Sequence, residues 1–291
     1  MAVSQAGPAA VAGRREHAPS HFWRRLRYHG LSVFAALALL YLLLPIAVVI
    51  AFSFNDPSGR FNTTWAGFSI HAWLHPFAQP GLRDAVVLSL EIAALATLAA
   101  TALGTLVALA LARYRFPGRA ATNLVVFLPL ATPEIVMGSS LLTLFISLNV
   151  GLGFWTILIA HIMFNISFVV VTVKARIHGF DRHLEEAAMD LYADELATFR
   201  RVTLPLIMPG ILAAALMSFA LSIDDFVITQ FNSGSLQTFP LWIYGASQRG
   251  IPVQVDVIGS AIFVVAVGLM AANVLLQRFR GAEERPRPQN R

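Results

Sequence analysis

The sequence predicts an all-α membrane protein with six transmembrane helices. Hydrophobic residues make up 57% of the 291 residues and charged residues only 13%, a composition too apolar for a soluble globular domain of this length. A helix needs about 20 residues to cross a hydrocarbon core about 30 Å thick, and six apolar runs reach that length. The bilayer is therefore expected to be the solvent for most of the chain, which must be mostly helical.

Each expected span is placed on one of these apolar runs. Residues 1–30 are expected to form a basic cytoplasmic tail, residues 31–279 the transmembrane domain and residues 280–291 a second cytoplasmic tail. The outermost parts, 1–20 and 282–291, contain almost no bulky apolar residues, so they are expected to be disordered. In chain order the spans are Leu31 to Ser53, Ala85 to Ala112, Ala120 to Leu148, Phe154 to Val173, Leu206 to Thr229 and Val257 to Phe279.

Positive charge decides the orientation of these spans. Short loops rich in lysine and arginine stay in the cytoplasm, and all of the 21 lysines and arginines except Arg60, Arg83 and Arg249 fall on one side of the six-span arrangement. Both termini are therefore expected in the cytoplasm. The same clustering at membrane exits accounts for the net charge of +5 without any binding of nucleic acid.

A polar, basic interval from Lys174 to Leu206 separates the fourth span from the fifth. Within it, acidic residues alternate with Ala, Met and Leu at spacings of three and four, which predicts an amphipathic helix that can seat in a groove of a partner. A solvated connector helix on the membrane surface is the simpler interpretation of this pattern. The acidic residues are Glu185, Glu186, Asp190, Asp194 and Glu195.

The chain lacks the phosphate-binding sequence of an ATPase. Its single lysine stands in Val173-Lys174-Ala175, so the motif G-x4-G-K-[ST] does not occur. We therefore expect no cofactor on this chain; if transport is driven by ATP, another polypeptide must bind ATP and Mg. With no cysteine and with histidines scattered through tails and loops apart from His161, no catalytic arrangement is expected either.

The spacing within the polar interval resembles the loop of ABC importer permeases, E-A-A-x3-G-x9-I-x-L-P. Glu186-Ala187-Ala188 is followed after three residues by Tyr192, where the family has glycine, and later by Val202-Thr203-Leu204-Pro205. The resemblance implies a type I ABC importer permease fold and a coupling helix that sits in a cleft of an ATP-binding subunit. Because glycine permits a positive φ angle, the tyrosine predicts either a different turn or additional contact surface. The resemblance gives the coupling role to Glu185, Glu186, Ala187, Ala188, Asp190, Tyr192, Leu204 and Pro205.

An ordered series of further motifs is similar to the spermidine/putrescine branch of these permeases. Trp65-Ala66-Gly67-Phe68-Ser69 lies in the first outer loop, Pro133-Glu134-Ile135-Val136 in the third span, and Ser222-Ile223-Asp224-Asp225-Phe226 in the fifth. The resemblance implies a permease subunit of an ATP-driven importer in the bacterial inner membrane, which carries polyamines or a related small cationic solute. It also implies three kinds of partner: a second permease, a dimer of ATP-binding subunits and an extracytoplasmic solute-binding protein.

Four carboxylates lie in the outer halves of apolar spans: Glu91, Glu134, Asp224 and Asp225. Each costs roughly 2.5–3.5 kcal/mol at the middle of a bilayer, so each is a candidate for the translocation pathway of a cationic solute. The alternative is structural: the two aspartates would cap the end of their helix, and the two glutamates would pair with polar neighbours.

Two other features point to helix packing. His161 and Asn165 have an i, i+4 spacing that could ligate a metal, but such residues more often make hydrogen bonds between transmembrane helices, so no metal site is expected. Small residues recur at every fourth position of the second span and would let another helix approach closely. These residues are Ala96, Ala100, Gly104, Ala108 and Ala112.

Other functions stay open on the sequence alone. The same architecture could import another small solute, such as an iron complex, an anion or an amino-phosphonate, although the four acidic groups argue against an anion. An ion-coupled secondary transporter would use the carboxylates to relay protons, but it would have no need for the pattern from Glu186 to Pro205. A membrane enzyme is the least supported reading, because no catalytic constellation is present.

Overall fold

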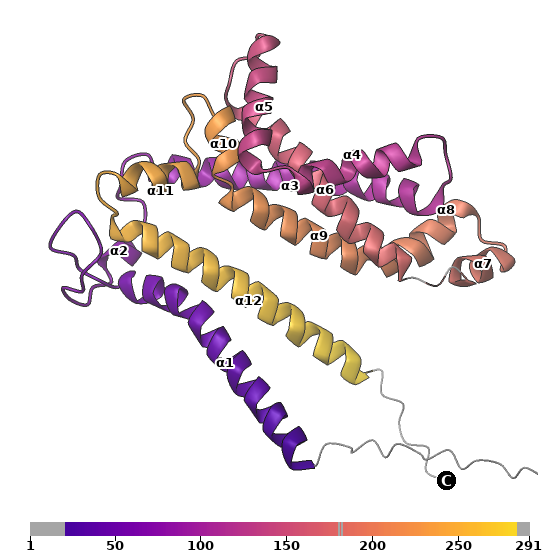
Figure 1. The fold of residues 1–291 in the computed structure, drawn as a ribbon, viewed down its shortest axis with the longest axis horizontal. Coiled ribbons are helices and arrows are strands. Elements are labelled where there is room, and N and C mark those ends of the chain that lie inside the picture. The colour runs from indigo at the N-terminus through magenta and orange to yellow at the C-terminus, as the bar shows by residue number, and fades with distance from the viewer. Residues whose placement is uncertain (1–20, 180, 182, 284–291) are drawn as a thin grey trace, which may run out of the picture.

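The computed structural model describes residues 21–179, 181 and 183–283, and the regular structure of these residues is helical (Figure 1). Within this part of the chain, strand-type pairing is limited to one bridge between Asn55 and Phe68. The helices are α1 (His21–Phe52), α2 (His71–Leu74), α3 (Leu82–Arg113), α4 (Arg119–Ala131), α5 (Glu134–Ser147), α6 (Phe154–His178), α7 (His183–Asp190), α8 (Glu195–Thr198), a π-helical turn η1 (Phe199–Thr203), α9 (Leu204–Asp224), α10 (Val227–Asn232), α11 (Phe239–Ser247) and α12 (Val253–Glu283).

The described helices include four that are long and apolar enough to cross a membrane. They comprise Gly30–Phe52, Leu82–Arg113, Phe154–His178 and Glu195–Asp224, and α4 with α5 makes a fifth only if the bent pair is counted as one span. The apolar part of α12, Val253–Gly268, is shorter. The outer parts of both expected tails, 1–20 and 284–291, lie outside the described residues, whereas residues 21–30 and 280–283 belong to α1 and α12.

The prediction of one continuous helix from Ala120 to Leu148 is wrong. α4 ends at Ala131, α5 begins at Glu134, and the two helices are bent by 110°. Proline has no amide hydrogen and disfavours the helical conformation of the residue before it. Thr132, which precedes Pro133, is accordingly extended, with φ −87° and ψ 131°.

The prediction of one helix from Leu206 to Thr229 is wrong for a related reason. α9 ends at Asp224, and Asp225 is extended, with φ −64° and ψ 121°. Its carboxylate accepts hydrogen bonds from the amides of Ile228 and Thr229, at 3.4 and 2.8 Å. These amides belong to the first turn of α10, so the aspartate begins a new helix where the apolar run alone predicts a continuous one.

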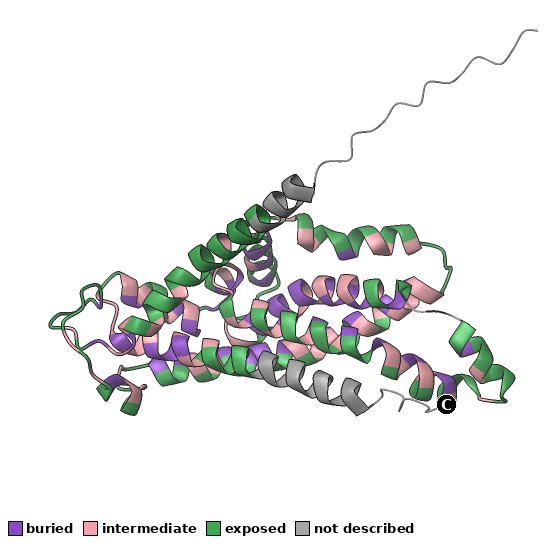
Figure 2. Cartoon of the chain, turned by 90° about the horizontal axis from the view of Figure 1, so that it is seen from below, coloured by how far each residue is buried: buried purple, intermediate pink, exposed green. Residues whose placement is uncertain are grey.

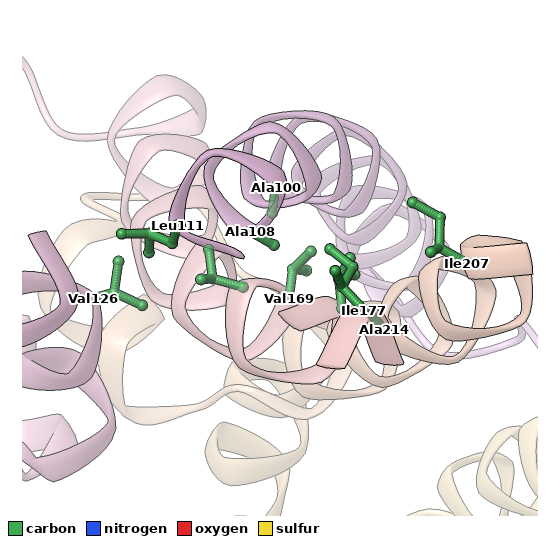
Figure 3. Packing of buried hydrophobic residues seen from close by; sticks show 10 residues of the cluster. Ala100, Ala108, Leu111, Val126, Val169, Ile177, Ile207 and Ala214 are labelled. Carbon is green, nitrogen blue, oxygen red and sulfur yellow. The ribbon is translucent and has the colours of Figure 1, made fainter. Parts of the chain in front are cut away.

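α3, α6 and α9 form the centre of the fold, and Figure 3 shows the apolar side chains that they bury together with Val126 of α4. The predicted small-residue stripe is confirmed as a packing surface, since its first four members on α3 are buried. A Cβ atom at Gly104 would lie 2.7 Å from Cγ1 of Val169 on α6. Glycine at this position is therefore what allows the two helices to approach so closely.

α1 lies at the edge of the fold, where it packs against α12. None of residues 30–52 is buried, and Figure 1 shows α1 standing away from the central helices, while Figure 2 shows this part of the helix as mostly exposed. A polar cluster joins its end to the start of α12. The side-chain amide of Asn62 donates to Asp256 at 2.6 Å, and that of Asn55 donates to Asn62 at 2.7 Å.

Candidate coupling and translocation sites

The polar interval contains α7, which is fixed to the rest of the chain by a buried carboxylate. Glu185 lies in the first turn of α7, is 8% exposed, and accepts hydrogen bonds from the guanidinium of Arg113 and the hydroxyl of Thr203. Arg113 is the last residue of α3, and Thr203 is the last residue of η1, directly before α9. One side chain therefore ties the short helix to two of the three central helices.

Tyr192 adopts the backbone conformation that a glycine at this position of the motif would allow. Its φ angle is +63°, so the chain keeps the left-handed turn for which glycine is suited. The amide of Ala193 donates to the carbonyl of Ala188 at 3.2 Å, and the amide of Tyr192 donates to the carbonyl of Met189 at 3.0 Å. These two bonds form the Schellman motif that ends a helix, with the tyrosine at its left-handed position. The side chain is 100% exposed.

The remaining residues of the predicted coupling set present an accessible surface. Glu186, Ala187 and Asp190 are exposed and Ala188 is half-buried. Pro205 stands in the first turn of α9, where its missing amide hydrogen costs little.

His183 and Glu186 form an exposed titratable pair on α7. Nδ1 of His183 is 3.0 Å from Oε2 of Glu186. This hydrogen bond, together with the negative charges of Asp181 and Glu186, raises the pKa of His183 above its ordinary value of 6.5. The imidazole therefore keeps its proton, and its attraction to the carboxylate, to a higher pH than a free histidine does.

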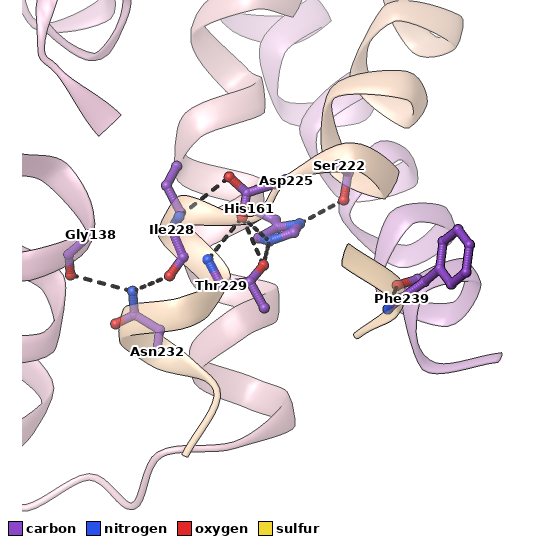
Figure 4. Close-up of polar contacts among 9 residues, drawn as sticks. Gly138, His161, Ser222, Asp225, Ile228, Thr229, Asn232 and Phe239 are labelled. Atoms are coloured by element: carbon purple, nitrogen blue, oxygen red, sulfur yellow. Dashed lines mark hydrogen bonds and ion pairs between the residues drawn. The ribbon is translucent and has the colours of Figure 1, made fainter. Parts of the chain in front are cut away.

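Asp225, one of the four predicted pathway carboxylates, lies in a buried polar cluster (Figure 4). Besides capping α10, its Oδ2 accepts the hydroxyl of Thr229 at 2.7 Å and lies 3.3 Å from Nε2 of His161. The other ring nitrogen of His161, Nδ1, lies 2.7 Å from Oγ of Ser222. Histidine and aspartate thus join α6, α9 and α10, which is the interhelical bonding expected of an intramembrane histidine.

The other predicted polar residues lie elsewhere. Glu91 on α3, Glu134 at the start of α5 and Asp224 are all exposed, and Asp224 lies beside a separate cavity. Among the described residues, no hydrogen bond or ion pair joins the four carboxylates to one another. Asn165 is fully buried, and its amide makes no hydrogen bond within the described part of the chain.

Reasoning from the sequence missed the partners that hold these residues. Arg113 was used only as a topology signal, yet it binds a carboxylate 72 positions further along the chain. Thr229 was treated as the last residue of a span, although an aspartate four positions before it is a recognisable capping pattern. Pairing between distant helices carries no comparable local signal, so Ser222 could not have been assigned to His161 in advance.

Comparisons with known proteins agree with this geometry. The sequence model of the family described as binding-protein-dependent transport system inner membrane component matches residues 100–285. The spermidine/putrescine transport system permease protein PotC of Haemophilus influenzae is 36% identical over 253 residues, covering 87% of this chain and 98% of that protein. PotC of Escherichia coli is 39% identical over 239 residues, covering 82% of this chain and 90% of that protein. The putrescine transport system permease protein PotI of Escherichia coli is 35% identical over 247 residues, covering 82% of this chain and 86% of that protein.

Solved structures share the fold at lower sequence identity. One is the crystal structure of a bacterial ABC transporter involved in the import of the acidic polysaccharide alginate. One of its chains aligns with a TM-score of 0.60 at 16% identity, over 88% of this chain and 96% of that chain. Another is the MetNI methionine ABC transporter in an inward-facing conformation, with a TM-score of 0.56 at 16% identity, over 68% of this chain and 95% of that chain.

Proposed function

The chain belongs to the binding-protein-dependent transport system inner membrane components, and on this premise we propose that it is the permease subunit of an ATP-driven importer of polyamines. One observation carries the substrate assignment. Curated relatives that are 35–39% identical over more than four fifths of the chain are permeases for spermidine and putrescine. Their match extends over 86–98% of their own length, so it is not confined to a shared fragment.

We place the permease in the membrane as six spans with both termini in the cytoplasm. In this arrangement, α4 and α5 form the third span together as a bent pair, and α12 is the sixth. The distribution of lysine and arginine supports this orientation. A reporter that fluoresces only in the cytoplasm should be bright when fused after Arg291 and dark when inserted near Gly59. Fluorescence at both positions would contradict the six-span arrangement.

The coupling function is assigned to α7 and the turn that follows it. In the proposed complex, a dimer of ATP-binding subunits holds the ATP and Mg, and its closure moves α7. The buried contacts of Glu185 with Arg113 and Thr203 support this role, because they provide a stiff connection from α7 to α3 and α9. A second permease and an extracytoplasmic solute-binding protein complete the complex. The binding protein would supply most of the affinity for the solute.

Reconstitution tests the proposal as a whole. The permease would be purified in complex with a second permease and the ATP-binding subunits, placed in liposomes, and supplied with a binding protein and radiolabelled spermidine or putrescine. We expect uptake that requires both ATP and the binding protein. Uptake of a different solute with no uptake of polyamine would overturn the substrate, and uptake without ATP would point instead to ion-coupled transport.

A single charge reversal tests the coupling role within the same assay. Glu186→Lys should abolish uptake or release the ATPase while the permease stays inserted in the membrane. Glu195→Lys is the matched control, because this glutamate is also exposed in the polar interval but lies outside the E-A-A motif. Unchanged uptake and ATPase binding in the Glu186 variant would show that α7 is not the docking element.

A further inference from the structure

An open cavity lies beside the end of α9, and the buried polar cluster around Asp225 is not part of it. Its volume is about 550 Å³, within the range of roughly 300–1,000 Å³ that is usual for small-molecule sites. The last turn of α9, the helix α11 and the first turns of α12 form its walls. Most of the lining is apolar, with an isoleucine from each of the three helices.

Asp224 is the only acidic residue among the described residues that line this cavity, and no lysine, arginine or histidine lines it. Asp224 is exposed, and its carboxylate makes no hydrogen bond or ion pair with any other side chain in the described part of the protein. Asp225, the next residue, has both carboxylate oxygens engaged by α10 and His161. The break between α9 and α10 therefore separates the two aspartates: one is structural, and the other is left without a counter-ion.

Three aromatic residues line the same cavity as this carboxylate, and two of them form a ring pair. Phe226 and Tyr244 both line the cavity, and their ring centroids are 5.0 Å apart at an angle of 47°. Tyr244 is 54% exposed, so part of its ring is accessible. Aromatic faces attract cations electrostatically, and organic ammonium groups are frequent ligands of such sites. A carboxylate with two rings and an aliphatic wall matches a primary ammonium group attached to a chain of methylene groups.

We propose that Asp224, Phe226 and Tyr244 form a subsite that holds one ammonium group of a polyamine as it passes through the permease. The aspartate neutralises the positive charge, the rings surround the ammonium, and the isoleucines contact the methylene chain. This inference rests on the proposed function and adds to it a specific position at which the solute is held.

The test uses the reconstituted complex with its binding protein and compares uptake of spermidine with ATP hydrolysis. Asp224→Asn removes the charge and keeps the shape, so spermidine uptake should fall by about tenfold, the loss typical of a hydrogen bond to a charged group. ATP hydrolysis without solute and assembly of the complex should be unchanged. Asp224→Glu keeps the charge and should retain most of the uptake.

The tyrosine gives an independent test if the aspartate variant fails to assemble. Tyr244→Leu should lower spermidine uptake by about threefold to tenfold, whereas Tyr244→Phe keeps the ring and should transport as the original protein does. N-acetylspermidine, which lacks one ammonium group, is a second probe. The preference for spermidine over this analogue should be smaller in Asp224→Asn than in the original protein, and since both use the same binding protein, the change reports the permease.

Three results would overturn the subsite. They are uptake by Asp224→Asn equal to that of the original protein, equal uptake by Tyr244→Leu and Tyr244→Phe, and an unchanged preference against the acetylated analogue. A cavity filled by lipid or by the second permease would give these results. They are distinguishable from failure of the proposed function, because in that case the original complex itself would not import polyamine.

Discussion

Replacing Tyr192 with glycine should stabilise the end of α7. A non-glycine residue in the left-handed conformation costs about 1–2 kcal/mol, and Tyr192 has a φ angle of +63°. Glycine removes this cost, but it also loses about 0.5–1 kcal/mol through the greater freedom of the unfolded chain. The expected net gain is about 1 kcal/mol, which corresponds to roughly fivefold slower opening of the turn.

Amide hydrogen exchange on the purified permease measures this gain locally. The amides to follow are those of Leu191, Tyr192 and Ala193, which bond to carbonyls of α7 in the helix-ending turn. Tyr192→Ala is the matched control, because it also removes the ring but keeps a side chain in the left-handed conformation. Exchange should be about fivefold slower in the glycine variant than in the alanine variant.

Equal exchange in the two variants would refute the reasoning, because the turn would then carry no strain for glycine to relieve. Binding of the ATPase by the same two variants also distinguishes the effect of the backbone turn from the effect of the side chain. Loss of ATPase binding in both would report the contact made by the exposed ring. A difference between them would report the conformation of the turn.

Three further predictions concern the packing and charges described above. Glu185→Gln should weaken the contact with Arg113 by about 1.5–3 kcal/mol. The amount of polyamine taken up per ATP hydrolysed should then fall. If this ratio equals that of the original protein, the contact does not transmit motion. Gly104→Leu should destabilise the central helices by about 1–3 kcal/mol through overpacking, which would lower the melting temperature in detergent. Gly104→Ala should lower it less. Melting temperatures equal to that of the original protein would mean that the helices do not approach as described. NMR titration should give His183 a pKa above 6.5 that falls in Glu186→Gln. Because this pKa is raised, the contact contributes to stability below about pH 6.5 and is lost as the pH rises through the raised pKa. A pKa that did not respond to the substitution would contradict the pairing.

The existence of most helices follows from the sequence, whereas the interruptions in two of them were missed. Hydropathy measures the length of an apolar run and does not detect a single residue that ends a helix within it. Both interruptions do have local causes that a closer reading could use. Pro133 restricts the residue before it, and Asp225 stands three and four positions before the amides that it caps.

For the candidate sites too, the sequence indicates local features better than it indicates tertiary contacts. Tyr192 in place of the motif glycine predicted either a different turn or additional contact surface; the left-handed turn is kept, and the ring is exposed. The four carboxylates were grouped because they lie at similar depth along their spans. Their environments differ because of tertiary contacts: His161, 64 positions before Asp225, lies beside that aspartate and not beside Asp224. Contacts of this kind depend on how the helices pack, which a single sequence does not specify.

The two interrupted helices also limit where lipid can lie. At each interruption, carbonyl and amide groups leave the helical ladder, and hydrocarbon offers them no hydrogen bonds. α5 and α10, the helices that follow the interruptions, lie against each other, and the side chain of Asn232 bonds to the carbonyl of Gly138 at 3.4 Å. Irregular backbone from two parts of the chain is therefore gathered in one region, which must be faced by protein or water. Lipid tails cannot satisfy these backbone groups, so the region must lie against the rest of the protein, a partner subunit or a water-filled passage.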